Sequence, residues 1–411
     1  MELVHVERWD HLGLIAWMIK DLGLISLIDA RLVPDEQEAS TPGEAVAGMI
    51  LKGLGVANRP LSLTPQFFTN KPLDLLCRPG GRAALCNRFT RGRTLDEVHA
   101  YGCDLWLSEL ALAVCAQERL AQRFHHLDTT SFALSGDYVP ASDEHAIGIT
   151  HGYAKAQRPD LQQAVLALLV SQDGGVPLVS KSWDGNTSDT QIFKERAEAL
   201  RAALARSPTP RYLVADAKLY TEETAATLAK LGFITRMPGT LKRVSQGITQ
   251  ALQWDRWHRL DETTRYDGLE LGHYGMAQRW LVVSSQAAME RAEASLTKAQ
   301  PRAWDAIETQ LLHLHAKCCE TPEAAQAART ALSTAWRYHQ RATSRVIDHK
   351  RYACKGRPTS TSPLKAIAWQ IPAQVRPAQE VIEAHKQQRA CFVMGTNIEA
   401  RHMGHAEVSR A

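Results

Sequence analysis

Two aspartates in this 411-residue chain occupy positions where carboxylates can do chemistry. Asp128 lies within an expected strand, and Asp216, 88 residues later, directly follows another. If these strands are neighbours, the carboxylates converge on one sheet edge. Oxygen ligands without His or Cys suit Mg²⁺ or Mn²⁺, and two such ions about 3.5–4 Å apart can activate a phosphodiester. On spacing alone, turn capping at strand ends is the favoured alternative for both residues.

The surrounding pattern predicts a mixed sheet that would position these residues. Apolar runs separated by turn and capping signals give the order β-β-β-α-β-α-β. Antiparallel strands come first and parallel strands follow. The expected elements are strands Phe124–Ser131, Ala164–Val170 and Val176–Ser180, a helix from Asp189 to about Ala205, strand Tyr212–Ala215, helix Thr221–Leu231 and strand Phe233–Arg236.

The segments before and after the predicted mixed sheet have different patterns of apolar residues. Residues 1–120 are expected to be helical, because apolar residues recur at helical spacing from Leu14 and capping boxes begin at Thr41 and Thr94. Further on, Trp280–Ser284 and Cys391–Gly395 are expected strands, and Ala287–Lys317 is expected to form long helices. Four prolines in Lys355–Pro377 favour loops and edge strands.

Several motifs, taken together, resemble the DDE transposases of bacterial insertion sequences. The resemblance is to the group that cuts DNA through a hairpin intermediate, in the branch with a long helical N-terminal domain. It runs from near residue 8 to about Asn397. The motifs are Ser40–Val46, His126–Ser131, Trp183-x-Gly185-Asn186-Thr187-Ser188-Asp189, Val214-Ala215-Asp216-x-x-x-Tyr220, Phe233–Pro238 and Gln278–Gln286.

This resemblance implies an α/β (α+β) fold with an RNase H-like mixed-sheet core, in which Asp128 and Asp216 are catalytic metal ligands for Mg²⁺ or Mn²⁺ in a two-metal site. It implies four regions: 1–120, a helical domain that could bind DNA ends; 121–240, the first part of the core; 241–390, an insertion domain; and 391–411, the last strand and tail. The implied activity is cut-and-paste transposition by a homodimer acting on terminal inverted repeats and target DNA.

The third carboxylate of the family is not found in the sequence. The family pattern is Tyr-x-x-Arg-x-x-x-Glu-x-x-x-x-x-x-Lys on a helix after the insertion. Tyr338 and Arg341 have the right spacing, but Arg345 stands where Glu is required. Glu399 and Glu407 lack the pattern around them. The expectation is therefore a truncated, catalytically impaired copy. A non-catalytic DNA-binding remnant or inhibitor and a hydrolytic nuclease on the same core remain alternatives.

Contacts with DNA are expected to come from scattered basic side chains and one aromatic ring. Lysine and arginine bind phosphates without reading sequence, and a tryptophan can stack on a flipped base. The alternative for the lysines and arginines is that they are ordinary surface charges. The alternative for the tryptophan is that it is a buried strand residue. The candidates are Lys155, Arg158, Lys181, Lys242, Arg243 and Trp280.

Composition is that of an ordinary globular protein, with 45% hydrophobic and 22% charged residues. The formal net charge is +4, and bases are concentrated after Arg341, which suits a polyanionic partner or simply a solvated surface. The eight cysteines form no Cys-x-x-Cys pair, as is typical of a reducing compartment. Without a signal peptide or an apolar stretch of about 20 residues, we expect a cytoplasmic protein and no membrane partner. The resemblance to insertion-sequence transposases implies in addition a bacterial, nucleoid-associated protein.

Overall fold

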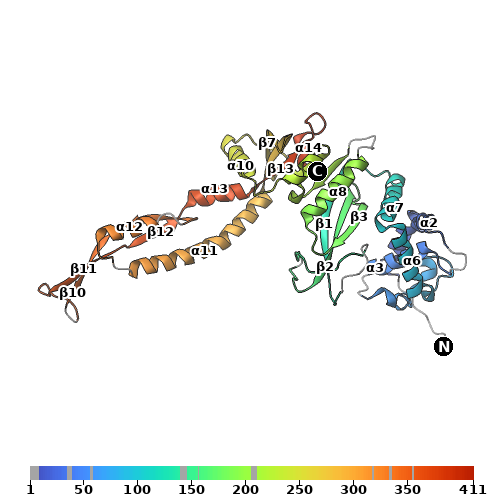
Figure 1. Cartoon of the computed structure of the whole chain (residues 1–411), viewed down its shortest axis with the longest axis horizontal. Helices are drawn as coiled ribbons and strands as arrows, with labels where there is room; N and C mark the ends of the chain where they lie inside the picture. The colour runs from blue at the N-terminus through green and yellow to red at the C-terminus, as the bar shows by residue number, and fades with distance from the viewer. Residues whose placement is uncertain are drawn as a thin grey trace. The chain divides into compact units, whose positions relative to one another are not determined.

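The computed structural model describes residues 9–411 except 35–38, 56–58, 139–145, 156, 205–210, 317–318, 333–335 and 354–355. The chain forms two compact units, Met1–Ile234 and Thr235–Ala411. The first contains the N-terminal helices and the strands that carry both aspartates (Figure 1). The four-region division expected from the sequence stays a prediction.

Helices fill the first part of the chain, as the sequence predicts. The longer ones are α1 (Leu12–Asp21), α2 (Leu24–Asp29), α3 (Pro42–Leu54), α6 (Arg88–Tyr101) and α7 (Cys103–Gln117). The proline-rich stretch between α3 and α6 contains four short helices: η1 (Leu61–Leu63), α4 (Thr64–Phe67), α5 (Leu73–Leu76) and η2 (Ala83–Cys86).

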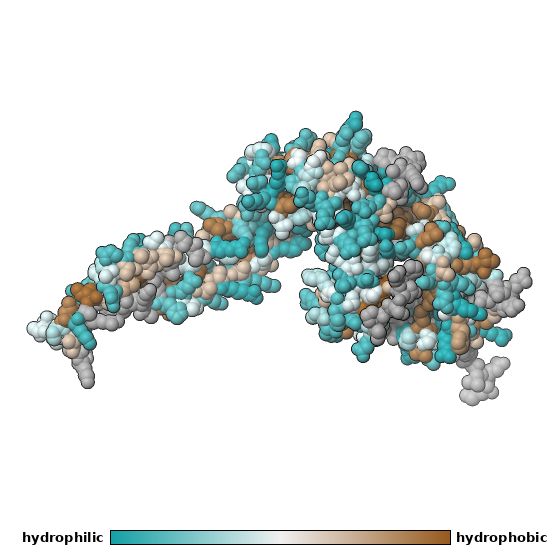
Figure 2. Space-filling view, in the orientation of Figure 1, coloured by the Kyte–Doolittle hydropathy of each residue, from teal (hydrophilic) through white to brown (hydrophobic). Residues whose placement is uncertain are grey.

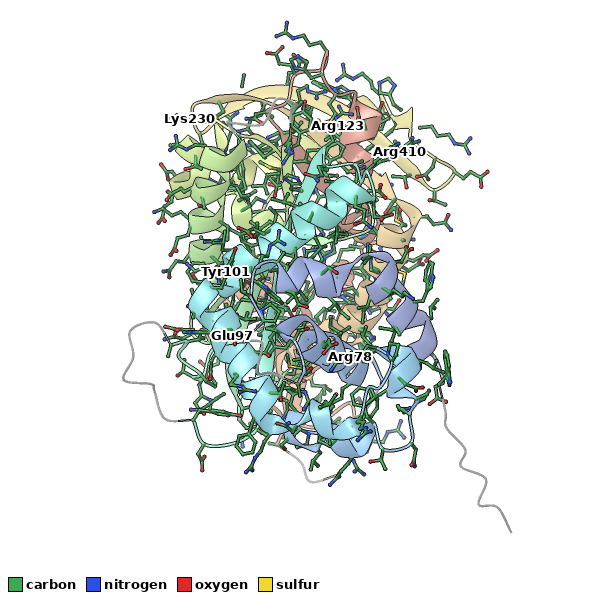
Figure 3. All side chains as sticks on the ribbon, turned by 90° about the vertical axis from the view of Figure 1, so that its right-hand side faces the viewer. Arg78, Glu97, Tyr101, Arg123, Lys230 and Arg410 are labelled. Atoms are coloured by element: carbon green, nitrogen blue, oxygen red, sulfur yellow. The ribbon has the colours of Figure 1, made fainter. Side chains whose placement is uncertain are left out.

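Two helix starts were predicted from capping boxes, and one is correct. The Thr41 hydroxyl accepts a hydrogen bond from the Glu44 backbone N–H, and the Glu44 carboxylate accepts one from the Thr41 backbone N–H. Arg78, labelled in Figure 3, also forms a 3.1 Å ion pair with Glu44. The second prediction is wrong: Thr94 lies inside α6, where its hydroxyl donates to the Thr90 carbonyl, and Asn87 caps this helix instead.

The apolar face of α1 also differs from the sequence expectation. Leu14 and Met18 belong to the repeating apolar set, yet both are exposed. The buried positions are Leu12, Ala16 and Ile19, of which only Ile19 belongs to the predicted set, and Ile15 of that set packs partly buried against the same cluster. The helix itself was therefore predictable, but the apolar residues around its circumference did not identify the packed side.

The first unit contains the β-β-β-α-β-α-β order predicted from the sequence. Strands β1, β2 and β3 are followed by α8, β4, the short η3, α9 and β5, and the hydrogen-bonded order is β3-β2-β1-β4-β5. Pairing is antiparallel through β1, β2 and β3, but parallel between β1 and β4. The fold is thus mixed α/β with an RNase H-like core. The bounds are β1 (Phe124–Leu134), β2 (Gln162–Ser171), β3 (Pro177–Asp184), α8 (Asp189–Leu204), β4 (Tyr212–Ala215), η3 (Ala217–Leu219), α9 (Glu222–Leu228) and β5 (Gly232–Arg236).

Helix packing fixes the sheet of the first unit. Ile192 of α8 is fully buried against Val165 and Ala167 of β2. Ala111 and Cys115 of α7 pack with Leu178 of β3. These buried contacts hold the strands that carry the two aspartates in place.

The second unit combines an antiparallel sheet with a helix and strand extension. Its strand order is β13-β8-β7-β6, and all these neighbours are antiparallel. The predicted strand Trp280–Ser284 is the centre of β8. A single 31-residue helix, α11, replaces the several helices expected from the sequence and contains Pro301. The bounds are α10 (Lys242–Trp254), β6 (His258–Arg259), β7 (Thr264–His273), β8 (Met276–Ser285), α11 (Gln286–Ala316), α12 (Pro322–Leu332), β9 (His339–Ser344), β10 (Ile347–Tyr352), β11 (Leu364–Gln370), β12 (Ala373–Pro377), α13 (Gln379–Arg389), β13 (Cys391–Thr396) and α14 (His405–Arg410).

The last residues are packed into the second unit. Ile398, Met403 and Val408 are buried. The buried Arg279 guanidinium of β8 donates to the carbonyls of Ile398 and Met403 at 2.9 and 2.8 Å. The tail is therefore held by both apolar contacts and charge-assisted hydrogen bonds.

The surface seen in Figure 2 is mainly hydrophilic, with scattered apolar side chains. Across the described ranges, none of the helices has both the length and the apolar character needed to span a bilayer.

Candidate active site

Asp128 lies in β1 of the first unit, and Asp216 directly follows the adjacent strand β4. Parallel pairing of β1 with β4 runs from Phe124 opposite Tyr212 to Leu127 opposite Ala215. Each aspartate is the next residue after this last pair. The neighbouring-strand geometry expected from the sequence is therefore present, and both aspartates come at the same end of the paired segment.

A backbone N–H orients each of the two carboxylates. The Thr129 N–H donates to Oδ1 of Asp128 at 2.7 Å. The Lys218 N–H donates to Oδ1 of Asp216 at 2.9 Å, where Asp216 caps the short helix η3. Both aspartates are exposed residues. Tyr220, at the end of the Asp216 motif, is instead a buried core residue whose ring lies 6.2 Å from that of Phe233.

The electrostatics of Asp216 reflect its neighbours. Desolvation raises the pKa of this carboxyl above its ordinary value, and the negative charges of Asp128 and Asp189 add to the rise, while Lys218 opposes it. The charges of both other carboxylates therefore disfavour ionisation of Asp216, as expected where acidic groups lie close together.

Asp189 is a third acidic group at this edge, and sequence reasoning assigned it only to the start of a helix. Asp189 is indeed the first residue of α8, but Ser188 supplies the side-chain acceptor for the Gln191 N–H. The Asp189 carboxylate instead accepts a 2.7 Å hydrogen bond from the Thr129 hydroxyl and pairs with the ammonium groups of Lys155 and Lys218.

The lysines determine the ionisation of Asp189. Burial works against its negative charge, but hydrogen bonds from Lys218 and Thr129 and the charge of Lys155 outweigh that effect and lower its pKa. The same hydrogen bond from the other side raises the pKa of Lys218. In the sequence, Thr129 directly follows Asp128, and Lys218 comes two residues after Asp216. This proximity to the two predicted aspartates is the sequence signal that these residues carry.

Close backbone packing orders the segment that leads to Lys155. A Cβ added at Gly185 would lie 2.0 Å from the Gln163 carbonyl oxygen and 2.5 Å from that of Thr150. The buried Gln163 amide donates to the carbonyls of Gly185 and Tyr153. Gly185 of the Trp183 motif is therefore needed for close approach, and this contact braces the chain just before Lys155.

The donor set at the Asp128–Asp216 edge fits a hard cation, because it consists of carboxylate oxygens. In the described ranges, no three His, Cys, Asp or Glu side chains are grouped closely enough to hold a metal ion. Asp128 and Asp216 are therefore a two-residue candidate set, and Asp189, whose oxygens are engaged by Lys and Thr, is not a third member of it.

The residues predicted to contact DNA are divided between the two units. Lys155 lies at the site. Arg158 is exposed and paired with Asp160 at 2.6 Å, and the Lys181 ammonium lies 4.2 Å from the centre of the Trp183 ring.

The other three predicted DNA contacts belong to the second unit. Lys242 begins α10, and Arg243 donates to the Gly272 carbonyl at 3.4 Å. Trp280 is fully buried and donates its indole N–H to Gln278, so its prediction as a stacking residue is wrong and the buried-strand alternative is right.

The two tail glutamates also belong to the second unit. Glu399 is well exposed and forms a 2.6 Å ion pair with Arg401, and Glu407 lies in the first turn of the six-residue helix α14.

Comparison with known proteins gives limited matches. Residues 4–112 match the family model described as a domain of unknown function, DUF4277. No curated protein matches the sequence. One similar solved structure is described as a cryo-EM structure of a piggyBac transposase synaptic complex with hairpin DNA; the TM-score is 0.31 and the identity 10%. The match covers 67% of this chain and spans 57% of the length of the other.

Proposed function

We propose that this protein is an insertion-sequence DNA transposase of the DDE type, a class that cleaves and joins DNA with bound metal ions, in a copy whose catalysis is impaired because the third acidic residue is not found. The observation that carries the proposal is the position of Asp128 and Asp216 directly after the paired residues Leu127 and Ala215 of neighbouring parallel strands. The motif resemblance around these residues adds support, because the same two aspartates are the ones it assigns as ligands.

In the proposed mechanism, two carboxylates at the sheet edge would bind the metal ions that act on a DNA phosphodiester. Asp128 and Asp216 would hold Mg²⁺ or Mn²⁺, which when bound stabilises charge on the attacking and leaving oxygens of phosphoryl transfer. The N–H groups of Thr129 and Lys218 fix the orientation of the two carboxylates. By resemblance, the protein would act as a homodimer on paired element ends.

Cation binding to the purified full chain tests the ligand assignment. Mg²⁺ or Mn²⁺ should raise the melting temperature by mass action on the folded state. The double variant Asp128→Ala with Asp216→Ala should lose this rise. A matched control is Asp74→Ala with Asp96→Ala, which removes two exposed carboxylates from the N-terminal helices. An equal rise in the Asp128 and Asp216 double variant would contradict the assignment.

A second candidate is a DNA-binding protein that does not cleave. It is favoured by one sequence observation, the lack of the Tyr/Arg/Glu/Lys pattern that carries the third carboxylate. Such a protein would bind element ends and form no nicks, hairpins or transfer products with Mn²⁺. The metal assay and the cleavage assay together separate it from an active transposase.

A further inference from the structure

Asp189 lies at the centre of a hydrogen-bond network that no metal role explains. Its side chain is 11% exposed. Oδ1 accepts from the Thr129 hydroxyl at 2.7 Å and from the Lys155 ammonium at 3.3 Å. Oδ2 accepts from the Lys218 ammonium. Both oxygens are thus engaged by donors, which leaves Asp189 poorly suited to ligate a cation in this arrangement.

The partners of Asp189 are tied to the two candidate ligands. Thr129 directly follows Asp128, and its backbone N–H donates to that carboxylate. Lys218 comes two residues after Asp216, and its backbone N–H donates to that carboxylate as well. Asp189, at the start of α8, therefore links the strand that carries one aspartate to the turn that carries the other.

The two lysines differ in how many of their donors are engaged. A lysine ammonium has three N–H donors. Lys155 lies within hydrogen-bond distance of three acceptors: the Thr129 carbonyl at 3.0 Å, the Thr129 hydroxyl at 2.9 Å and Asp189 at 3.3 Å. Lys218 has Asp189 as its one side-chain hydrogen-bond acceptor in the described ranges, and its side chain is 46% exposed.

We propose that Asp189 is a positioning residue that holds Lys218 as a phosphate-binding group beside Asp128 and Asp216, with Lys155 and Thr129 supporting Asp189 from the other side. The inference rests on the proposed function and names the group that receives the DNA backbone. Three carboxylates repel a phosphodiester anion, and a lysine ammonium on the exposed side of the network supplies the opposing attraction. A phosphate can accept from the remaining Lys218 donors while one donor stays with Asp189.

Salt-dependent binding of the full chain to a short DNA duplex of arbitrary sequence tests the role of Lys218. Log affinity falls with log salt concentration, and the loss of one phosphate contact makes this negative slope less steep by about 0.9. We expect that change in Lys218→Gln and recovery of the slope in Lys218→Arg. The control is Lys194→Gln on α8, whose side chain is 42% exposed and ion-paired with Glu223. It should leave the slope unchanged.

Asp189→Asn tests the positioning role through the sign of its effect. If Asp189 is only a negative charge near DNA, its neutralisation strengthens binding. If it positions Lys218, the variant binds more weakly and with a smaller slope, and adding it to Lys218→Gln causes no further loss. A lower melting temperature with an unchanged slope would mean a purely structural role and overturn the inference.

The outcomes separate this inference from the function it rests on. If the wild-type chain does not bind DNA at all, the proposed function fails. If it binds DNA and Lys218→Gln keeps the full slope, only the inference about Asp189 and Lys218 is wrong. Lys218→Gln keeps the test decisive if Asp189→Asn does not fold, because it probes the phosphate contact directly.

Discussion

Single residues at the sheet edge divide into those whose sequence position revealed them and those revealed only by contacts. Asp128 and Asp216 could be singled out from the motifs around them, because their positions at expected strands alone favoured turn capping. Thr129 and Lys218 lie close to these aspartates in the sequence, but their roles could not be predicted there, because those roles come from contacts with one carboxylate on a different element. Asp189 looked like a helix-start residue, since Asp is common there for reasons unrelated to any site.

The buried His125 should make the free energy of unfolding depend on pH. Its ring is 2% exposed and both ring nitrogens lack a hydrogen-bond partner in the described structure. Burial, with Arg211 and His126, lowers the pKa of His125 from 6.5 to about 4. The folded state therefore disfavours protonation, so its stability is complete above pH 6.5 and falls as the pH drops toward 4.

The expected loss from His125 approaches about 3 kcal/mol at the acid end of this range. His125→Leu should remove this part of the pH dependence in denaturant unfolding, while His99→Leu, at an exposed position on α6, should leave it. Other buried histidines will keep part of the slope in both variants. Parallel pH profiles for wild type and His125→Leu would contradict the prediction.

Elements were predicted more reliably than their packed faces or joints. Strand β4 could be delimited from its apolar run between turn signals, and the start of α3 from its capping box. The exposed face of α1 could not, because apolar residues surround that helix. Strands β9 and β10 were missed since their sequences are rich in polar and basic residues and they pair only locally with β12 and β11.

The N-terminal cap of α3 should contribute measurably to the stability of the first unit. Thr41→Val removes the hydroxyl that accepts from the Glu44 N–H, and we expect a loss of about 1 kcal/mol. Thr41→Ser keeps the acceptor and should stay close to wild type. The measurement is the first thermal transition of the full chain. Equal melting of the Val and Ser variants would show that the capping bond contributes little.

Two glycine-to-alanine changes should act in opposite directions. Gly185→Ala places a methyl group against the Gln163 and Thr150 carbonyls, so we expect a loss of about 1–3 kcal/mol or more. Gly92→Ala lies inside α6 with no atom near the added methyl, and should stabilise by up to about 1 kcal/mol. Melting temperatures that shift in the same direction would mean that the close approach at Gly185 can relax.

At the scale of the whole molecule, strand cleavage requires both the aspartate pair and a third acidic ligand, and only the first of these is identified. One carboxylate pair is assembled within the first unit, whereas the sequence contains no helix pattern for a third acidic ligand. With two ligands alone, a cation pair would be weakly held. DNA binding through lysine and arginine does not depend on that third group.

We therefore predict that this 411-residue chain binds DNA but does not cut it. Purified protein, Mn²⁺ and DNA carrying the ends of the element that encodes it should give no nicks or hairpins at the end boundary. The gel-shift of the same DNA should remain. Cleavage at the boundary that disappears in Asp128→Ala would show that the chain finds a third ligand elsewhere.

The parallel pairing of β1 with β4 has a consequence for synthesis on the ribosome. At about 5–20 residues per second, roughly 4–18 s pass between addition of Asp128 and addition of Asp216. Once β2 (Gln162–Ser171) has also been added, β1 can pair with it, but β1 keeps an open edge on its other side, where unpaired backbone groups can bind wrong partners. The two carboxylates of the proposed site can therefore come together only after β4 and Asp216 have been added.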